Sequence, residues 1–525
     1  MSIASASTVA ASPDPVADLL TRYADQLAGQ LRCFDRVLLH GTLVDVAHPG
    51  ALITRMHAAG FRPRDVARFA QPFNTQIRDN AIALARQHGV EIEVVTRKNF
   101  RQEDRVAQIL QTRGAQPGLV HIFAVKEAAQ GYDTRYARAD GYAQVFVRRG
   151  CCLHYYFYFL HERLGLIHVR VPTWLPFRMQ VYLNGHSWLA RQLTAAGVNH
   201  TLADNAFSAC VDWPRAQALA DALDPHALHA ELDALARRCA PVVAHFPNGY
   251  HWSLTQVEYA HDLVFKDPAV VDWLFEALAR QALLVIQAED VARFLGKRVP
   301  LNHDTPVNSH LGRRHAGLRL KHSLGPASVK LYNKPGGILR LEVTTCDVSF
   351  FRHYRTVEHR DGTKEACVAA MKKSLYSLRD LAAGMRAGVA RYGQWLATLV
   401  EHSASRREVE QLGQAARDAG GAQLSGLQPV SGGRRDGAGH GAAGRVCVGR
   451  TDAPAVAAGV AAVEPQSSGP AVAPVAAART AAQNRAHLHL LSDCVCAAGA
   501  DDGLALAGVG GAAPAPSRRR HGLNN

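Results

Sequence analysis

The sequence predicts a multi-domain protein of mixed α/β (α+β) class, and three observations lead to this prediction. Short apolar runs of strand character alternate with stretches whose hydrophobic residues recur at helical spacing. The middle of the chain is rich in aromatic residues, which favour strands. Hydrophobic residues make up 48% of the 525 positions and charged residues 20%, so the chain can bury a sizeable core.

Changes in pattern and composition along the chain divide it into five expected segments. These are a disordered leader (1–14), an α/β domain (15–145), an aromatic-rich central and helical domain (146–300), a basic β-hairpin with a long helix (301–405), and a low-complexity tail (420–525). The tail sustains neither a helical nor a strand period, so we expect it to be disordered. It is either a natural flexible tail or the product of a frameshift near residues 420–425.

The elements within these segments follow from hydrophobic spacing. In the α/β domain we expect strands over 35–43 and 120–125, with helices over 50–60 and 63–88. In the central domain the aromatic run 153–160 and the run 166–173 form a hairpin. A helix then covers 187–196, and a further helix covers 253–265. Strands 328–332 and 338–343 form a second hairpin, and a long helix covers about 364–402.

The net charge of +14, with a pI of about 9.5, indicates a polyanionic partner. That partner is DNA, RNA or anionic lipid. The alternative is that a GC-rich gene encodes many Arg residues and the protein binds no polyanion. The N-terminus shows no signal peptide, and no apolar run reaches membrane-spanning length. The ten cysteines lack structural zinc spacing. We therefore expect a cytoplasmic protein with reduced thiols and no membrane partner.

The segment VKLYNKPGGILRLEV (329–343) carries the most distinctive pattern. Because strand residues alternate faces, Lys330, Tyr332 and Lys334 share one face, and Arg340 and Glu342 likewise share one. A cation–aromatic–cation row suits a phosphate backbone with a base stacked on the ring. Glu342 then either holds Arg340 in place or binds a metal. The alternative is a surface hairpin with solvated charges.

The full set of nucleic-acid candidates adds the basic run 313–322 and polar residues of the central domain. It comprises Arg313, Arg314, Arg319, Lys321, Lys330, Tyr332, Lys334, Arg340, His168, Arg170 and Arg191. For some of these a packing role is the alternative, because His168 could be a satisfied buried histidine and Arg191 could lie along an apolar helix face.

Dispersed carboxylates could serve a metal-dependent nuclease, which needs acidic side chains converging from different elements. The catalytic candidates are Asp35, Glu127, Asp204, Glu258 and Asp262. Within the expected helix 253–265, Glu258 and Asp262 lie four residues apart on one face. Together with Asp35 they are the expected ligands of Mg²⁺. The alternatives are an ion pair for Asp35 and a solvated helix face for the other two.

These motifs resemble known proteins. The Lys-x-Tyr-x-Lys…Leu-Arg-x-Glu pattern is similar to a hairpin in phage and plasmid replication-initiation proteins. CFDRVLLHGTL (33–43), HVRVPTWLPFRMQVYLNGHSWLARQL (168–193) and QVEYAHDLVFKD (256–267) resemble a widespread, largely uncharacterised bacterial family found with mobile elements. Some of its members continue into a winged-helix segment and are named as regulators for that reason. This sequence shows no recognisable winged-helix pattern.

Rolling-circle initiators use a His-hydrophobe-His metal pair together with a nucleophilic tyrosine. The chain's one such pair is His487–His489, which lies in the tail and is attributed to chance. Tyr155, Tyr156, Tyr158, Tyr182 and Tyr332 are the tyrosines that such a nuclease could use, but aromatic strand residues are more often core.

The resemblance implies a DNA-binding protein of a mobile element, either transposase-like or replication-initiator-like. If it is an enzyme, its reaction is Mg²⁺-assisted cleavage or transfer of a DNA strand. The alternatives are a non-enzymatic DNA-binding regulator and a decayed copy that binds without activity. The sequence leaves RNA as a partner and homo-oligomerisation open.

Overall fold

The computed structural model describes residue 19 and residues 22–97, 100–114, 116–136, 143–298, 307–314 and 317–401, with two short strands at 416–417 and 423–424. The expected leader (1–14) lies outside the described residues, and so does the expected tail (420–525) apart from 423–424.

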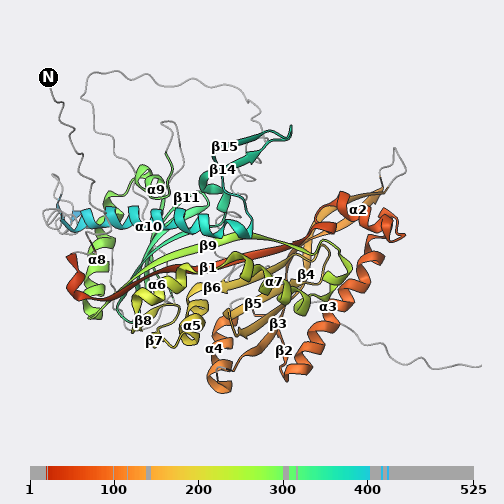
Figure 1. Ribbon diagram of the computed structural model, residues 1–525, viewed down its shortest axis with the longest axis horizontal. Coiled ribbons are helices and arrows are strands. Elements are labelled where there is room, and N and C mark those ends of the chain that lie inside the picture. Colours follow the sequence, from red (N-terminus) through yellow and green to blue (C-terminus); the bar gives the residue numbers. More distant parts are fainter. Residues whose placement is uncertain are drawn as a thin grey trace, which may run out of the picture.

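One eleven-stranded sheet organises the described part of the chain (Figure 1). Its strand order is β10-β11-β12-β13-β9-β1-β6-β5-β4-β3-β2. Neighbouring strands are antiparallel, except that β2 and β3 are parallel. The strands are β1 (Leu27–Leu43), β2 (Ile92–Val95), β3 (Gly118–Tyr136), β4 (Ala143–His161), β5 (Gly165–Pro172), β6 (Met179–Asn184), β9 (Tyr250–Phe265), β10 (Asn308–Arg314), β11 (Gly317–Leu324), β12 (Ala327–Lys334) and β13 (Ile338–Thr345).

Three two-stranded sheets complete the β-structure of the described residues. They are β7 (His200–Leu202) with β8 (Phe207–Cys210), β14 (Arg352–Glu358) with β15 (Lys364–Ala370), and β16 (Ala416–Arg417) with β17 (Gln423–Leu424).

Helices cover both faces of the large sheet. They are α2 (Pro49–Ala58), α3 (Val66–His88), α4 (Gln102–Arg113), α5 (Gly185–Ala195), α6 (Trp213–Asp221), α7 (Pro225–Cys239), α8 (Pro268–Val285), α9 (Ala288–Phe294) and α10 (Leu378–Glu401). The largest apolar core lies between one sheet face and α3, α7, α8, α9 and α10. On the other face α4 packs near Phe123, while α5 and α6 pack over Leu31 and Cys33. In Figure 1, α10 and α5 accordingly lie on opposite sides of β1 and β9.

The α+β class is confirmed, but the sheet crosses the expected domain boundaries. β3 pairs with β4 across residue 145, and β13 pairs with β9 across residue 300. β1 lies between β9 and β6, so the first strand of the described residues lies inside the sheet. The boundaries at 145 and 300 therefore do not separate independent sheets. Local composition could not show this, because the pairing joins strands that are far apart in the sequence.

Two expected helices need correction. Residues 253–265 form strand β9, whose second half is buried at every position. A strand buried on both faces loses its alternation, so spacing alone does not separate it from a buried helix. The long helix begins at Leu378 rather than near residue 364, because 364–370 form β15. None of the described helices combines the length and the apolar character needed to cross a bilayer.

Candidate functional site

Three buried carboxylates converge from three adjacent strands in the middle of the sheet. Asp35 lies on β1, Glu258 on β9 and Glu342 on β13, and each offers an oxygen within 4.8 Å of the others. Their residues are 6%, 7% and 1% exposed. We call these three residues the carboxylate cluster. Oxygen ligands of this kind suit hard divalent cations such as Mg²⁺.

A β-bulge directs Asp35 into this cluster. Phe34 pairs with Tyr259 of β9 and Arg36 pairs with Glu258, so Asp35 is left without a partner on β9. A bulge of this kind re-aims the side chain of its extra residue. Helix α5 begins directly above it, where the side chain of Asn184 accepts a hydrogen bond from the Ser187 N–H and caps the helix.

The close approach of α5 to the bulge requires glycine at position 185. A Cβ atom there would lie 1.9 Å from the carbonyl oxygen of Phe34. We expect Gly185→Ala to lower the free energy of unfolding by about 1–3 kcal/mol, because α5 must move away from β1. Gly384→Ala on α10 is the matched control, since its Cβ would meet Phe351 at an ordinary 3.7 Å. Denaturant unfolding measures both variants, and equal stability would contradict this account.

Arg340 is the centre of a network beside the cluster. Its side chain is fully buried, and its Nε and Nη2 donate to the two oxygens of Asp262 at 2.6 and 2.7 Å. Nη2 also donates to the carbonyl oxygen of Asn205 at 2.7 Å. Nη1 lies 3.2 Å from Asp35 Oδ1 but has no hydrogen-bond partner of good geometry among the described residues. The guanidinium therefore joins β13, β9, β1 and the β7–β8 turn.

His186 at the start of α5 lies between the same two aspartates. Its Nδ1 is 3.0 Å from Asp35 Oδ1, and its Nε2 is 3.2 Å from Asp262 Oδ2. Burial opposes a charged ring here, but neighbouring Cys33 and the two carboxylates raise the pKa of His186 well above its usual value. Both aspartates therefore favour the charged form of the ring, whose Nε2 also lies 3.0 Å from the Arg340 Nη2.

Lys330 on β12 lies between the two glutamates of the cluster. Its Nζ donates to Glu342 Oε1 at 2.6 Å and to Glu258 Oε1 at 3.2 Å. Arg36 approaches Glu258 from the other side, with Nε 3.7 Å from Oε2. The Arg36 Nε is buried and has no hydrogen-bond partner in the described part of the chain. The cluster thus has a cation on each flank, and the buried Arg36 Nε is left without a hydrogen bond among the described residues.

The pKa shifts show that the negative charges of the three carboxylates are compensated to different degrees. Burial favours the neutral acid, but Arg340 and His186 hold the pKa of Asp35 well below its usual range. Lys330 and Arg36 likewise outweigh burial at Glu258 and lower its pKa. Burial raises the pKa of Glu342. The nearby Glu258 carboxylate raises it further, and Lys330 offsets these two effects only in part. Glu342 is therefore the member with the least compensated negative charge.

The structure brings together only part of the expected acidic set. Asp35 and Glu258 meet as expected, but the third carboxylate is Glu342, while Asp262 is occupied by Arg340. Glu127 is remote, because β6, β5 and β4 separate β3 from β1 in the sheet. It accepts hydrogen bonds from Tyr156 and Arg170 instead. Asp204 lies in the β7–β8 turn, half exposed, 3.4 Å from Lys334 Nζ.

The expected exposed cationic row does not form. Lys330, Lys334 and Arg340 are at most 4% exposed and bind carboxylates or amides of the protein itself, including Asn205. These side chains lie in the middle of a covered sheet, so they cannot line an open surface. The other candidates are less enclosed. Tyr332, Arg319, Lys321, His168, Arg170 and Arg191 are half-buried, Arg313 is exposed, and Arg314 ends β10.

Sequence reasoning missed two members of the site. Asn205 donates to both oxygens of Asp35 at 2.7 and 3.0 Å, and its side chain also accepts from Lys334. His186 lies within the segment 168–193 but is not among the site residues predicted from the sequence. Its place directly after a strand and an Asn-Gly pair is a usable signal for a helix start. Nothing near Asn205 in the sequence indicates its role.

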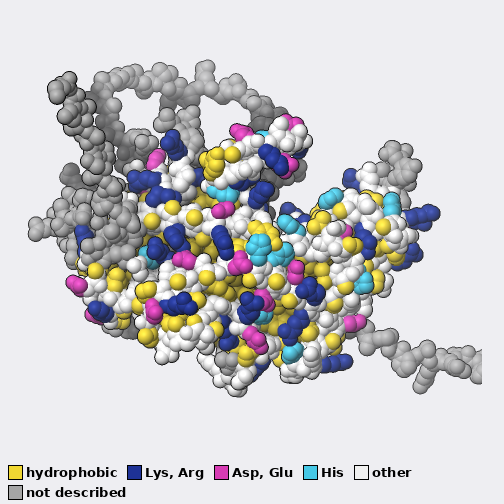
Figure 2. Space-filling model, in the orientation of Figure 1, with side chains coloured by type: hydrophobic (Ala, Val, Ile, Leu, Met, Phe, Trp, Pro, Cys, Tyr) yellow, Lys and Arg dark blue, Asp and Glu magenta, His cyan; other side chains and the backbone are white. Residues whose placement is uncertain are grey.

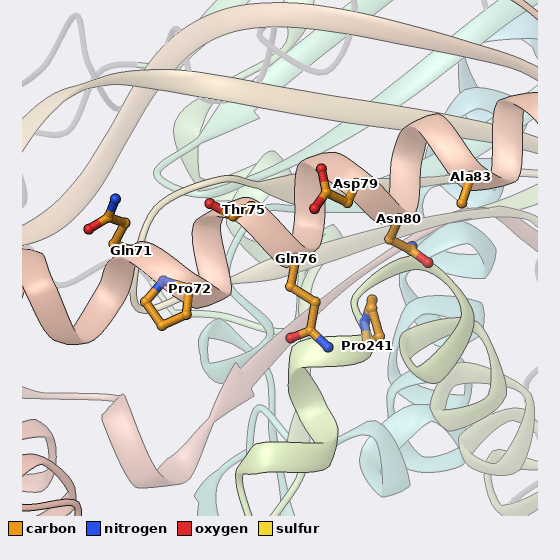
Figure 3. Close-up of a pocket in the computed structure, with 8 residues that line it drawn as sticks. All are labelled: Gln71, Pro72, Thr75, Gln76, Asp79, Asn80, Ala83 and Pro241. Atoms are coloured by element: carbon orange, nitrogen blue, oxygen red, sulfur yellow. The ribbon is translucent and has the colours of Figure 1, made fainter.

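A depression in the described surface lies elsewhere. It has a volume of about 750 Å³ and lies between α3 and Pro241 (Figure 3). Its lining is Gln71, Pro72, Thr75, Gln76, Asp79, Asn80, Ala83 and Pro241. That lining offers one carboxylate and no cation, so it lacks the groups that acid–base or phosphate chemistry needs. The carboxylate cluster remains the better candidate.

Comparisons with known proteins give no relative. No protein-family model, curated protein or solved structure matches the chain.

Proposed function

We propose that the chain is a DNA-binding protein of a mobile element, transposase-like or replication-initiator-like, that cleaves or transfers a DNA strand. The observation that supports the chemistry is the convergence of Asp35, Glu258 and Glu342 from three strands. In this proposal they hold a divalent cation such as Mg²⁺, and the cation would neutralise charge on a phosphodiester and activate water.

The residues present fit such an ion. All three ligands are carboxylates, which is the donor set that Mg²⁺ and Mn²⁺ prefer. The raised pKa of Glu342 marks negative charge that burial disfavours and Lys330 compensates only in part. The Arg36 side chain lies beside Glu258 and is 29% exposed, so its guanidinium is the cation of the site that a phosphate could approach. Lys330 donates to an oxygen of each glutamate, so a bound cation would have to share these oxygens with it.

One observation favours the second candidate, a DNA-binding regulator without activity. Lys330 and Arg36 already pair with the two glutamates, and Arg340 and His186 already face Asp35 and Asp262, so the carboxylates are compensated without a metal ion. A buried set of paired charges can persist for its structural role alone. This candidate predicts DNA binding that needs no divalent ion. A decayed copy would behave in the same way.

Metal binding and strand cleavage, measured on the full chain, separate these candidates. We expect Mn²⁺ to bind by titration calorimetry and to support nicking of labelled DNA. Asp35→Asn should lower the nicking rate at least about 100-fold, because it removes charge from the ion's ligands. Glu127→Gln is the matched control and should retain full activity, since Glu127 lies outside the cluster. Mn²⁺-independent DNA binding without nicking would instead support the regulator.

A further inference from the structure

The β14–β15 hairpin is separate from the large sheet. Its strands pair only with each other in the described part of the chain, in the register Arg352↔Ala370 to Glu358↔Lys364. In Figure 1 it projects from the body beside α10 as a free two-stranded ribbon. We call residues 352–370 the ribbon. Isolated two-stranded hairpins are marginally stable in water, so such a projection suggests a use for its surface.

The outward face of the ribbon carries exposed side chains. It carries Tyr354 opposite Val368, and these side chains are 71% and 55% exposed. On either side of this pair lie the small residues Ala366 and Ala370, both exposed. Small side chains let a backbone approach another surface closely. An apolar pair between them suits the methyl group of thymine.

The charge of the ribbon and its base is positive. Between Arg352 and Lys373 there are six Lys or Arg residues and three Asp or Glu residues, a difference of +3. Figure 2 shows basic side chains on this projection, with acidic ones among them. Arg360, Lys364 and Lys372 are exposed and make no ion pair within the described part of the chain. Free cations on a narrow projection favour a polyanion over a neutral protein surface.

The dimensions of the ribbon fit the major groove of duplex DNA better than that of duplex RNA. Seven-residue strands are about 24 Å long, and paired strands are about 4.8 Å apart. The major groove of B-DNA is about 12 Å wide and about 8.5 Å deep, and it admits a two-stranded β-ribbon. The deep, narrow major groove of duplex RNA does not admit side chains.

We propose that the ribbon enters the major groove of duplex DNA. Tyr354 and Val368 face the base edges, while Arg360 and Lys364 near the tip contact phosphates. This inference rests on DNA being the partner in the proposed function, but it shares no residue with the carboxylate cluster. Ribbon and cluster can therefore be tested apart.

The test measures duplex binding by the full chain in EDTA over a series of salt concentrations. Arg360→Gln with Lys364→Gln should weaken binding about tenfold. It should also lower the slope of log affinity against log salt by about 1.8, since each phosphate contact contributes about 0.9. Arg64→Gln with Arg86→Gln removes two exposed cations from the α3 region and is the matched control. Unchanged affinity and slope in the ribbon variant would overturn the proposal.

A second measurement reads the groove directly. Methylation of guanine N7, which lies in the major groove, should be blocked by the parent chain and restored by Tyr354→Ser. Binding without N7 protection would overturn the proposal. A change in oligomeric state of either ribbon variant, with DNA affinity retained, would overturn it in favour of contact between two copies.

Cleavage is decided independently of the ribbon. Asp35→Asn should bind duplex in EDTA with the parent's salt slope, whereas the ribbon variant should bind Mn²⁺ as the parent does. Loss of nicking in Asp35→Asn with an unchanged ribbon variant would uphold the cluster and reject the ribbon. Weaker DNA binding by the ribbon variant, together with unchanged nicking in Asp35→Asn, would uphold the ribbon and reject the cluster.

Discussion

Arg340→Met is expected to destabilise the protein by about 3–5 kcal/mol, close to the whole stability of many domains. The substitution keeps an unbranched apolar stem but leaves the carboxylates of Asp262 and Asp35 buried without their main counter-charge. It also removes the donor to the Asn205 carbonyl, which ties the β7–β8 turn to β13. Thermal and denaturant unfolding measure the loss.

The control and the rescue for this prediction are both available in the chain. Arg191→Met on α5 changes a half-buried arginine outside the network and should alter stability by less than about 0.5 kcal/mol. Asp262→Asn added to Arg340→Met should recover part of the loss, because one uncompensated charge is removed. If Arg340→Met unfolds at the same denaturant concentration as Arg191→Met, the buried network does not stabilise the fold as described.

Acid unfolding between about pH 6.5 and pH 4 is the second large expected effect. Burial lowers the pKa of three histidines, to about 4 in His154 and to about 3 in His261 and His322. Arg170 adds to the shift at His154, and Arg32 adds to it at His261. All three residues are at most 2% exposed. Their neutral rings are part of the native packing, so protonation must break it.

The sign follows from the depressed pKa values. The stability that these histidines contribute is fully present above the unfolded pKa and is lost as the pH falls toward the folded value. Each group contributes about 1.4 kcal/mol per pH unit in that window, so three contribute about 4 kcal/mol per unit. The raised pKa of Glu342 acts in the opposite direction, but the lowered pKa values of His40 and His168 act with the three histidines.

The pH dependence of the unfolding midpoint tests this account. The three rings should account for about three of the protons taken up on unfolding near pH 5, to which His40 and His168 add, and His322→Asn should take up about one proton fewer than the parent. His359→Asn, on the exposed end of the ribbon, controls for the loss of an imidazole. A stability that is flat from pH 6.5 to pH 4 would contradict the prediction.

The sequence predicted elements better than it predicted their partners. The strand near 35–43, the hairpins at 153–173 and 328–343 and the helices at 50–60 and 63–88 are confirmed, because their spacing is local. The pairing of β1 with β9 is not local, and β9 itself was expected as a helix. Glu258 and Asp262 share a face in either structure, since positions four apart do so in a strand as well as in a helix.

Glu342 shows why the site could be predicted only in part. The alternation in RLE correctly put Arg340 and Glu342 on one face, and a metal-binding role for Glu342 was one of two options. The sequence could not show which carboxylates lie beside them, because that depends on the order of strands in the sheet. It also could not show that Lys330 is enclosed, because a charged residue in a strand usually indicates a solvated face.

The position of β1 inside the sheet has a consequence for synthesis of the protein. Both strands that carry the other two members of the cluster are made much later, and β13 ends at Thr345, about 300 residues after β1 ends at Leu43. At a translation rate of about 5–20 residues per second, roughly 15–60 s pass between the synthesis of β1 and that of β13, which completes the site. During that interval its buried charges lack their partners and its edge is open to other chains. We expect nascent chains to depend on chaperones until β13 has emerged.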